Sequence, residues 1–229
     1  MNMIIMSHRG AAGLRPENTI AAIRAGMQAN ADIIEFDIRL TKDDIPVLSH
    51  DFHTLRTHKR IDIIRMHTLS ELRHRHSGSD HPIVTLDEAL KEGFGKVLLN
   101  IEVKHRNAVE PTLAVTRKYI RRKSDWQNIL FSSFSVAALQ RLRDQEQHAQ
   151  LALLHSINAL SFVAHDRKLR LSAVGFHRLR LTKLAVEIAK RLGLFVYVYT
   201  VNRPEALRKL AQEGVDGIVT DFPNKFIKK

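Results

Sequence analysis

The sequence contains no cysteine, which excludes disulfide bonds, thiolate metal sites and cysteine nucleophiles. Any bound metal ion must therefore take oxygen or imidazole ligands. Glycine and proline are also sparse, with 10 and 6 residues spread over the 229 residues of the chain. No linker, low-complexity stretch or repeat of solenoid length interrupts the sequence. We therefore expect residues 1–229 to form a single domain.

Long apolar runs are missing as well. No stretch approaches the roughly 20 apolar residues that a helix needs to span a bilayer. The first apolar run, within MNMIIMSHRG, is far shorter than the core of a signal peptide and lacks a basic leader. A hydrophobic content of 44% is nevertheless ample for a sizeable core. We expect a soluble cytoplasmic protein, either a monomer or a homodimer.

Acidic residues are fewer than basic ones, at 24 against 36, which gives a formal net charge of +12. Such a field favours anionic ligands, namely phosphates, nucleic acids or acidic membrane surfaces. The basic residues are mostly scattered, however, and aromatic residues make up only 6% of the chain without any nucleic-acid-binding motif. We expect no nucleic-acid partner and at most weak contact with anionic membranes. The alternative function outside the enzymes is a basic protein that binds nucleic acids or membrane surfaces.

Short runs rich in β-branched residues alternate with longer segments of helical period, a pattern typical of repeated βα units on a parallel sheet. Eight runs are candidate strands: Met3–Ser7, Asp32–Leu40, Lys96–Val103, Asn128–Ser132, Gln150–Leu154, Ser172–Phe176, Leu194–Thr200 and Gly217–Thr220. Eight is the number that closes a barrel, so the sequence predicts an α/β protein with the (β/α)8 TIM-barrel fold. An open doubly wound sheet is the second choice, but no glycine-rich dinucleotide fingerprint follows the first run.

One segment breaks the alternation. A short strand-like run, Ile45–Ser49, leads into a polar stretch, and we interpret residues of about 51–82 as a small cap inserted between the second strand and the second helix. Histidines are frequent in this stretch, among them His50, His53, His58, His67, His74 and His76. Their spacing fits no zinc-binding pattern. We expect the cap to be solvated and mobile.

The second and third long runs carry paired charges. Period-two alternation sends Glu35 and Asp37 to one face of their strand, and Glu102 and Lys104 to one face of theirs. If the apolar face packs on helices, the charged face points into the barrel, where an unpaired carboxylate would cost several kcal/mol. Three carboxylates beside one lysine require a compensating cation. Oxygen ligands favour Mg²⁺ or Ca²⁺, which makes Glu35, Asp37 and Glu102 candidate metal ligands.

The plain structural alternative is that these acids only pair with Lys104, Arg9 and Arg39. Two histidines favour a catalytic site instead. His8 directly follows the first strand, and His50 follows the short run after the second, so both lie toward the strand ends where barrel enzymes build active sites. Imidazoles that titrate near neutral pH serve as general acid and general base.

Taken together, these residues form a series of motifs that resembles the glycerophosphodiester phosphodiesterase family. The series runs in order along the chain: His8-Arg-Gly, Pro16-Glu-Asn-Thr, Glu35-Phe-Asp, His50-Asp-Phe-His-Thr-Leu-Arg-Thr, Ile101-Glu-Val-Lys, Phe131-Ser-Ser-Phe, Thr200-Val-Asn and Thr220-Asp-Phe-Pro. It covers essentially the whole sequence. The combination is specific, although the first motif alone would be weak.

The resemblance implies a (β/α)8 barrel that hydrolyses glycerophosphodiesters to glycerol 3-phosphate and an alcohol. It implies that the three acids hold a divalent metal and that His8 and His50 are the catalytic acid–base pair. Arg9 and Lys104 match positions that contact the phosphate. The insertion after His50 matches the family's substrate cap, which varies with the substrate.

The sequence departs from the family pattern at two places. Tyr199-Thr-Val-Asn stands where the family often has tryptophan in first position, which keeps an aromatic wall at the substrate site but changes its size and adds a hydroxyl. Lys42-Asp43-Asp44 stands where a turn often contains Asp-Gly, and the missing glycine makes a positive φ less comfortable there. The first change bears on substrate preference, the second only on the turn.

Several assignments stay open on sequence grounds. We take His50 as the acid that protonates the leaving group, and the nucleophile is either water or a neighbouring glycerol hydroxyl that gives a cyclic phosphate first. His177 is assigned no role beyond a substrate contact, while Asn202 and Asp221, near strand ends, either serve the site or fix loops.

A second enzymatic reading is a lysophospholipase D or sphingomyelinase D-like activity on an acylated substrate. It requires an apolar channel, for which the cap offers Phe52, Leu55, Ile61, Ile63, Ile64 and Met66. The simpler interpretation is that these residues pack against one another within the cap.

Overall fold

A computed structural model describes residues 3–79, 81–155 and 160–226. The strands are β1 (Ile4–Ser7), β2 (Ile33–Leu40), β3 (Pro46–Leu48), β4 (Leu98–Val103), β5 (Ile129–Ser133), β6 (Gln150–His155), β7 (Ala173–His177), β8 (Phe195–Tyr199) and β9 (Gly217–Thr220). The α-helices are α1 (Ile20–Gln28), α2 (Leu55–His58), α3 (Leu69–Arg75), α4 (Leu86–Gly93), α5 (Val109–Thr116), α6 (Val136–Gln145), α7 (Ser161–Leu169), α8 (Lys183–Arg191) and α9 (Ala206–Gln212). Short 3₁₀ helices span Ile64–Met66, Arg106–Ala108, Lys123–Asn128 and Pro223–Lys225.

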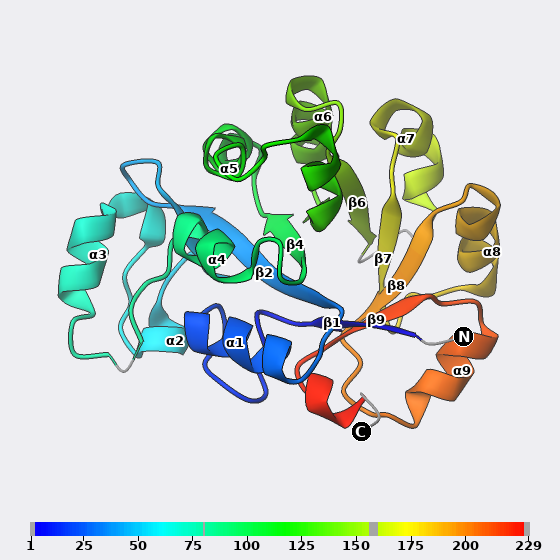
Figure 1. The fold of residues 1–229 in the computed structure, drawn as a ribbon, viewed down its shortest axis with the longest axis horizontal. Helices are drawn as coiled ribbons and strands as arrows, with labels where there is room; N and C mark the ends of the chain where they lie inside the picture. The colour runs from blue at the N-terminus through cyan, green and yellow to red at the C-terminus, as the bar shows by residue number, and fades with distance from the viewer. Residues whose placement is uncertain (1–2, 80, 156–159, 227–229) are drawn as a thin grey trace.

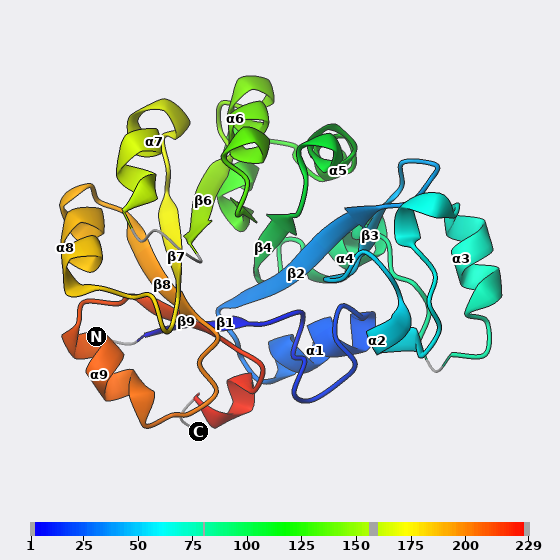
Figure 2. The same ribbon diagram turned by 180° about the vertical axis from the view of Figure 1, so that it is seen from behind.

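Eight parallel strands close into a barrel. Their order is β1-β9-β8-β7-β6-β5-β4-β2, and β2 pairs with β1 to complete the ring. Helices surround the strands on the outside, as Figures 1 and 2 show from opposite sides. The predicted (β/α)8 fold is therefore confirmed. The observed bounds of the eight long strands lie within two residues of the predicted ones at either end.

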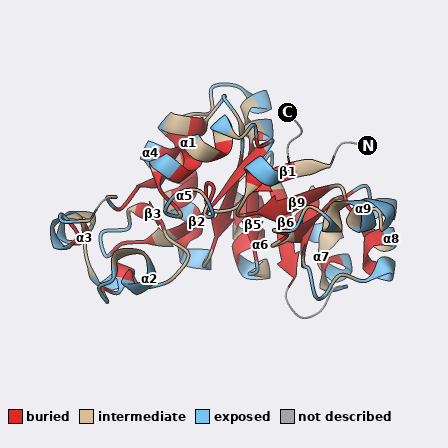
Figure 3. Ribbon diagram, turned by 90° about the horizontal axis from the view of Figure 1, so that it is seen from below, coloured by how far each residue is buried: buried red, intermediate tan, exposed pale blue. Residues whose placement is uncertain are grey.

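Side-chain alternation divides the apolar residues between two layers. Ile34, Phe36 and Ile38 of β2 belong to the large core between the strands and the helices. Inside the barrel, Met6 and Tyr197 belong to a smaller apolar cluster. The strands are buried almost throughout, whereas most helices expose one face (Figure 3). The residues at the mouth of the barrel are thus held by buried, well-packed strands.

Several helices begin at a side chain that satisfies a free backbone N–H group. The hydroxyls of Thr19, Ser135 and Thr182 each accept a hydrogen bond from the backbone three residues later, at α1, α6 and α8. At α4, Thr85 and Glu88 form a reciprocal capping box. These local signals place the helix starts, and hence the loops that follow each strand.

The inserted segment begins directly after β3. This strand pairs antiparallel with the end of β2, through Ile38 to Leu40, outside the closed ring. Helices α2 and α3 follow and lie to one side of the barrel (Figure 1); we call residues 51–79 and 81–82 the cap. The turn before β3 takes a positive φ of 58° at Asp44 without glycine, which aspartate tolerates better than most residues.

No helix among the described residues is long and apolar enough to cross a lipid bilayer.

Candidate active site

Three carboxylates converge inside the barrel at the carboxyl ends of two neighbouring strands. Glu35 and Asp37 lie on β2 and Glu102 on β4, and the sheet register sets Asp37 directly opposite Glu102. One carboxylate oxygen from each lies within 4.8 Å of the others. All three side chains are buried, with 4%, 1% and 9% of their residue surfaces exposed, so their charges have little help from water.

Two cations compensate part of this charge. The Lys104 ammonium lies 2.5 Å from Asp37 and also pairs with Glu102, and the Arg9 guanidinium lies 3.4 Å from Asp37. Arg39, the third partner that the plain alternative requires, instead donates to the backbone carbonyl of His50 at 2.8 Å. Within the described residues, the buried Oε1 atom of Glu35 has no hydrogen-bond partner. The set therefore keeps an uncompensated carboxylate oxygen among hard oxygen donors, which fits a divalent cation.

The pKa values of the three acids move apart because three close carboxylates cannot all ionise easily. Burial and the charge of Asp37 raise the pKa of Glu35 to about 8. Burial also raises the pKa of Glu102, where Lys104 only partly opposes it. Burial alone would raise the pKa of Asp37 too, but the adjacent Lys104 and Arg9 reverse the effect and lower it. Asp37 is thus the fixed anion of the group, and Glu35 holds a proton near neutral pH in the absence of a cation.

A tight turn after β1 brings Arg9 against the acids. Arg9 adopts a left-handed backbone, with φ of 50°, and its N–H group donates to Glu35 at 2.7 Å. Gly10 follows with φ of 90°, and a Cβ atom there would lie 2.6 Å from the Cβ of Ala22 on α1. Only glycine fits between the turn and the helix. The His-Arg-Gly motif thereby gains a steric explanation.

The next motif, Pro-Glu-Asn-Thr, supplies two residues to which the sequence assigned no role. The Asn18 amide donates to the Asp37 carboxylate at 3.0 Å and accepts from its backbone N–H at 3.1 Å. Glu17 accepts from the Arg9 guanidinium at 3.0 Å. These two residues fix one metal-ligand candidate and one cation, and their motif was the signal that pointed to them.

His8 is held by a carboxylate from the far end of the chain. Its Nδ1 atom lies 2.6 Å from Asp221, which follows β9. Asn202 in turn donates to Asp221 at 2.6 Å. Burial disfavours the charged imidazole, but the hydrogen bond to Asp221 and the nearby charge of Glu35 outweigh it, so the pKa of His8 is raised. Asp221 and Asn202 therefore orient a candidate catalytic residue as well as fixing loops.

His50 is also held through its Nδ1 atom by a carboxylate, which here comes from the cap. Its Nδ1 atom lies 2.7 Å from Asp51, and Arg56 of α2 donates to the other oxygen of Asp51 at 2.8 Å. Arg56 also pairs with Glu17, the partner of Arg9. Burial lowers the pKa of His50 despite the nearby Asp37. The two histidines thus share a geometry but their pKa values shift in opposite directions.

Aromatic side chains wall the small central cavity. This cavity measures about 40 Å³, and its lining includes His8, Glu35, Glu102 and Tyr199. The Tyr199 hydroxyl donates to the His155 carbonyl at 2.7 Å, which fixes the ring at the mouth. His177 packs edge-on to Tyr199, with ring centroids 5.9 Å apart, and lines a larger groove beside this cavity.

The cap differs from the expectation of a solvated segment. His76 is buried, and the ring of His58 packs against both His76 and His81, with ring centroids 4.6 Å and 5.1 Å apart, respectively. Burial and the charges of its two neighbours lower the pKa of His58 to about 4. The imidazoles of His58 and His76, whose pKa values are both lowered by burial, therefore pack within the cap in their neutral form.

The apolar residues of the cap do not all pack it. Ile64 is buried, in a cluster with Val47 and Leu72. The other five are exposed by 38–67% of their surfaces: Phe52, Leu55, Ile61, Ile63 and Met66. Packing therefore explains one of the six residues.

Comparisons with known proteins agree with this geometry. A sequence model described as the glycerophosphoryl diester phosphodiesterase family matches residues 8–225. A glycerophosphodiester phosphodiesterase of Caldanaerobacter subterraneus subsp. tengcongensis is 30% identical over 240 residues, which cover 99% of this chain and 97% of that protein.

Solved structures give the same result. The glycerophosphodiester phosphodiesterase of Thermotoga maritima superposes with a TM-score of 0.84 and 30% identity, covering 99% of this chain and 97% of the other. A phosphodiesterase of Oleispira antarctica, solved in complex with the product sn-glycerol-3-phosphate, gives a TM-score of 0.87 at 25% identity, with coverage of 97% and 94%.

Proposed function

This chain belongs to the glycerophosphoryl diester phosphodiesterase family, and from that premise we propose that it hydrolyses glycerophosphodiesters by metal-assisted acid–base catalysis at the barrel mouth. The observation that carries this proposal is the pair of histidines, each held through Nδ1 by a carboxylate, that flank a cluster of three acids. The whole chain acts as one catalytic domain in this proposal, with residues of about 51–82 as its cap.

Glu35, Asp37 and Glu102 would hold a divalent cation, Mg²⁺ or Ca²⁺. When bound, the cation neutralises charge on the equatorial phosphate oxygens. Its donor set fits because the oxygens are hard ligands and one of them lacks any partner among the described residues.

The remaining positive charge comes from Arg9 and Lys104, which lie beside the acids and would bind the phosphate of the substrate. A phosphodiester is an anion, so it repels an incoming nucleophile until positive groups such as these screen the charge on the phosphate oxygens. Tyr199 would contact the substrate at the wall of the cavity.

We assign the general base to His50 and the general acid to His8, which reverses the assignment expected from the sequence. A lowered pKa leaves the His50 imidazole neutral and able to take the proton of the nucleophile through Nε2. A raised pKa favours the protonated form of His8, whose Nε2 proton passes to the alcohol oxygen as the bond from phosphorus to that oxygen breaks. The nucleophilic oxygen forms the new bond to phosphorus. The part of the His8 shift that comes from Asp221 does not depend on the charge of Glu35.

The direct test is a coupled assay of glycerol 3-phosphate release from several glycerophosphodiesters with Mg²⁺, Ca²⁺ or chelator. Chelator and Glu35→Gln should each abolish most activity. Glu187→Gln makes the same chemical change on the exposed face of α8 and should have no effect. Activity that survives both the chelator and Glu35→Gln contradicts the metal-assisted mechanism.

The exposed apolar residues of the cap favour one second candidate, a lysophospholipase D or sphingomyelinase D-like activity. Phe52, Ile61 and Met66 expose 57%, 67% and 65% of their surfaces, more than cap packing requires. An acyl chain would cover such a surface. Comparison of kcat/KM for glycerophosphocholine and its acylated form decides between the two, since the acylated form should be the better substrate only for the second activity.

A further inference from the structure

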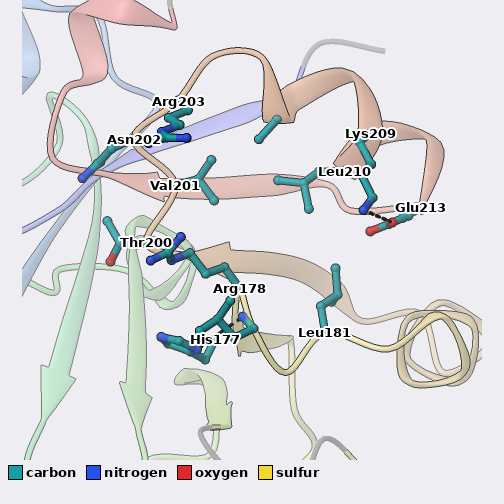
Figure 4. A pocket seen from close by; sticks show the side chains of 12 residues that line it. His177, Arg178, Leu181, Thr200, Val201, Asn202, Arg203, Lys209, Leu210 and Glu213 are labelled. Atoms are coloured by element: carbon teal, nitrogen blue, oxygen red, sulfur yellow. Dashed lines mark hydrogen bonds and ion pairs between the residues drawn. The ribbon is translucent and has the colours of Figure 1, made fainter.

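A groove of about 810 Å³ lies beside the catalytic cavity. It is formed by the loops that follow β7 and β8 and by one face of α9, so it opens at the same end of the barrel as the acids. Figure 4 shows Arg178 and Arg203 toward the end where Asn202 lies, and the Lys209–Glu213 ion pair at the other end. Its size far exceeds that of the cavity itself, and nothing in the proposed chemistry uses it.

The groove carries an excess of positive charge. Lys209 and Glu213 lie 3.8 Å apart and offset each other. Within the described residues, no hydrogen bond or ion pair holds the side chain of Arg178 or Arg203. Isolated surface arginines are ordinary, but these two line one concavity, where their fields add. Two exposed guanidinium groups that line one hollow offer charge-assisted hydrogen-bond donors to an oxyanion.

The groove is connected to the proposed general acid by two hydrogen bonds. Asn202 lines the groove and donates to Asp221, which holds His8. On the other wall, the backbone N–H of Arg178 donates to the carbonyl of Tyr199 at 2.9 Å. An alcohol that takes its proton from His8 would leave on the side of the cavity where Asp221 and Asn202 lie, so its far end would extend toward the groove.

We propose that the groove binds a phosphate monoester carried by the alcohol half of the substrate, so that the preferred substrates are glycerophosphodiesters with a second, terminal phosphate. The inference rests on the proposed function, because it needs a diester whose alcohol leaves beside His8. A terminal phosphate matches the excess positive charge of the groove, since its two negative charges neutralise two guanidinium groups. A neutral or cationic alcohol would leave both unpaired.

The test uses two substrates that differ by one group, glycerophosphoglycerol and the same diester with a phosphate on its terminal glycerol. At constant ionic strength, the wild type should show a kcat/KM about 10- to 100-fold higher for the phosphorylated diester, the range that one or two charge-assisted contacts give. The double variant Arg178→Gln/Arg203→Gln should lose this preference and keep its kcat/KM for glycerophosphoglycerol.

The matched control is Lys118→Gln/Arg121→Gln, which removes the same charge from exposed positions between α5 and β5, at the opposite end of the barrel. It should retain the preference. Equal kcat/KM for the two diesters in the wild type, or an equal loss in both double variants, overturns the inference and leaves the proposed function intact. If neither diester is hydrolysed, the proposed function fails, and calorimetric binding of the phosphorylated diester to wild type and groove variant still decides whether the groove holds the phosphate.

Discussion

Binding of a divalent cation should release a proton from Glu35. In the cation-free protein, burial and the charge of Asp37 hold the pKa of Glu35 at about 8. At pH 7 this carboxyl is therefore about nine-tenths protonated, whereas a metal ligand must be ionised. The expected release is about 0.9 proton per ion at pH 7 and about 0.1 at pH 9. The apparent affinity should accordingly rise about tenfold per pH unit below pH 7 and level off above pH 8.

Isothermal titration of Mg²⁺ or Ca²⁺ in two buffers that differ in ionisation enthalpy measures this proton directly. Glu35→Gln should remove most of the release. His8→Gln is the informative control, because the pKa of His8 is also raised and a cation would repel its proton; release that persists in this variant comes from the carboxyls. Binding without proton release at pH 7, together with an affinity independent of pH between 6 and 8, would refute the reasoning about Glu35.

Three further changes test other parts of the site. Asp221→Asn replaces the carboxylate that raises the pKa of His8 with a neutral amide, so the alkaline limb of the kcat/KM profile should move to lower pH; an unchanged limb contradicts the assignment of the acid. Arg56→Gln should lower kcat roughly tenfold through misplacement of His50, with little change in Tm because exposed ion pairs contribute about 0–1 kcal/mol. Gly10→Ala should lower the free energy of unfolding in urea by about 2–4 kcal/mol, since the added Cβ meets helix α1; a loss under about 1 kcal/mol would show that the turn can shift.

The sequence was sufficient to predict the charged face of the barrel. Alternation along a strand follows from backbone geometry, so Glu35 and Asp37 had to share a face, and the hydrophobic partners on the other face indicated which one. Parallel order then brought Glu102 beside them. These inferences depend only on residues near one another in the chain or on neighbouring strands.

Partners from distant parts of the chain could not be predicted in the same way. Asp221 reaches His8 across 213 residues, because β9 lies next to β1 in the closed ring, and nothing local to either residue indicates that contact. The assignment of acid and base to the histidines depended on such partners. In the cap, Ile64 is buried while Met66 is exposed, and a 3₁₀ helix of three residues is too short for any periodicity to separate them.

The way β2 is shared between two sets of neighbours has a consequence for how this architecture can diversify. Its first residues pair with β1 and close the ring, whereas its last residues extend past that closure and carry β3. Insertions and deletions after β3 therefore leave the register of the eight closed strands untouched. A cap exchanged between homologues at this hairpin would have to keep its contacts with the barrel, among them the ion pair of Arg56 with Glu17 and the packing of Ile64 against Val47. Substrate range and barrel stability can thus evolve, or be engineered, as separable traits.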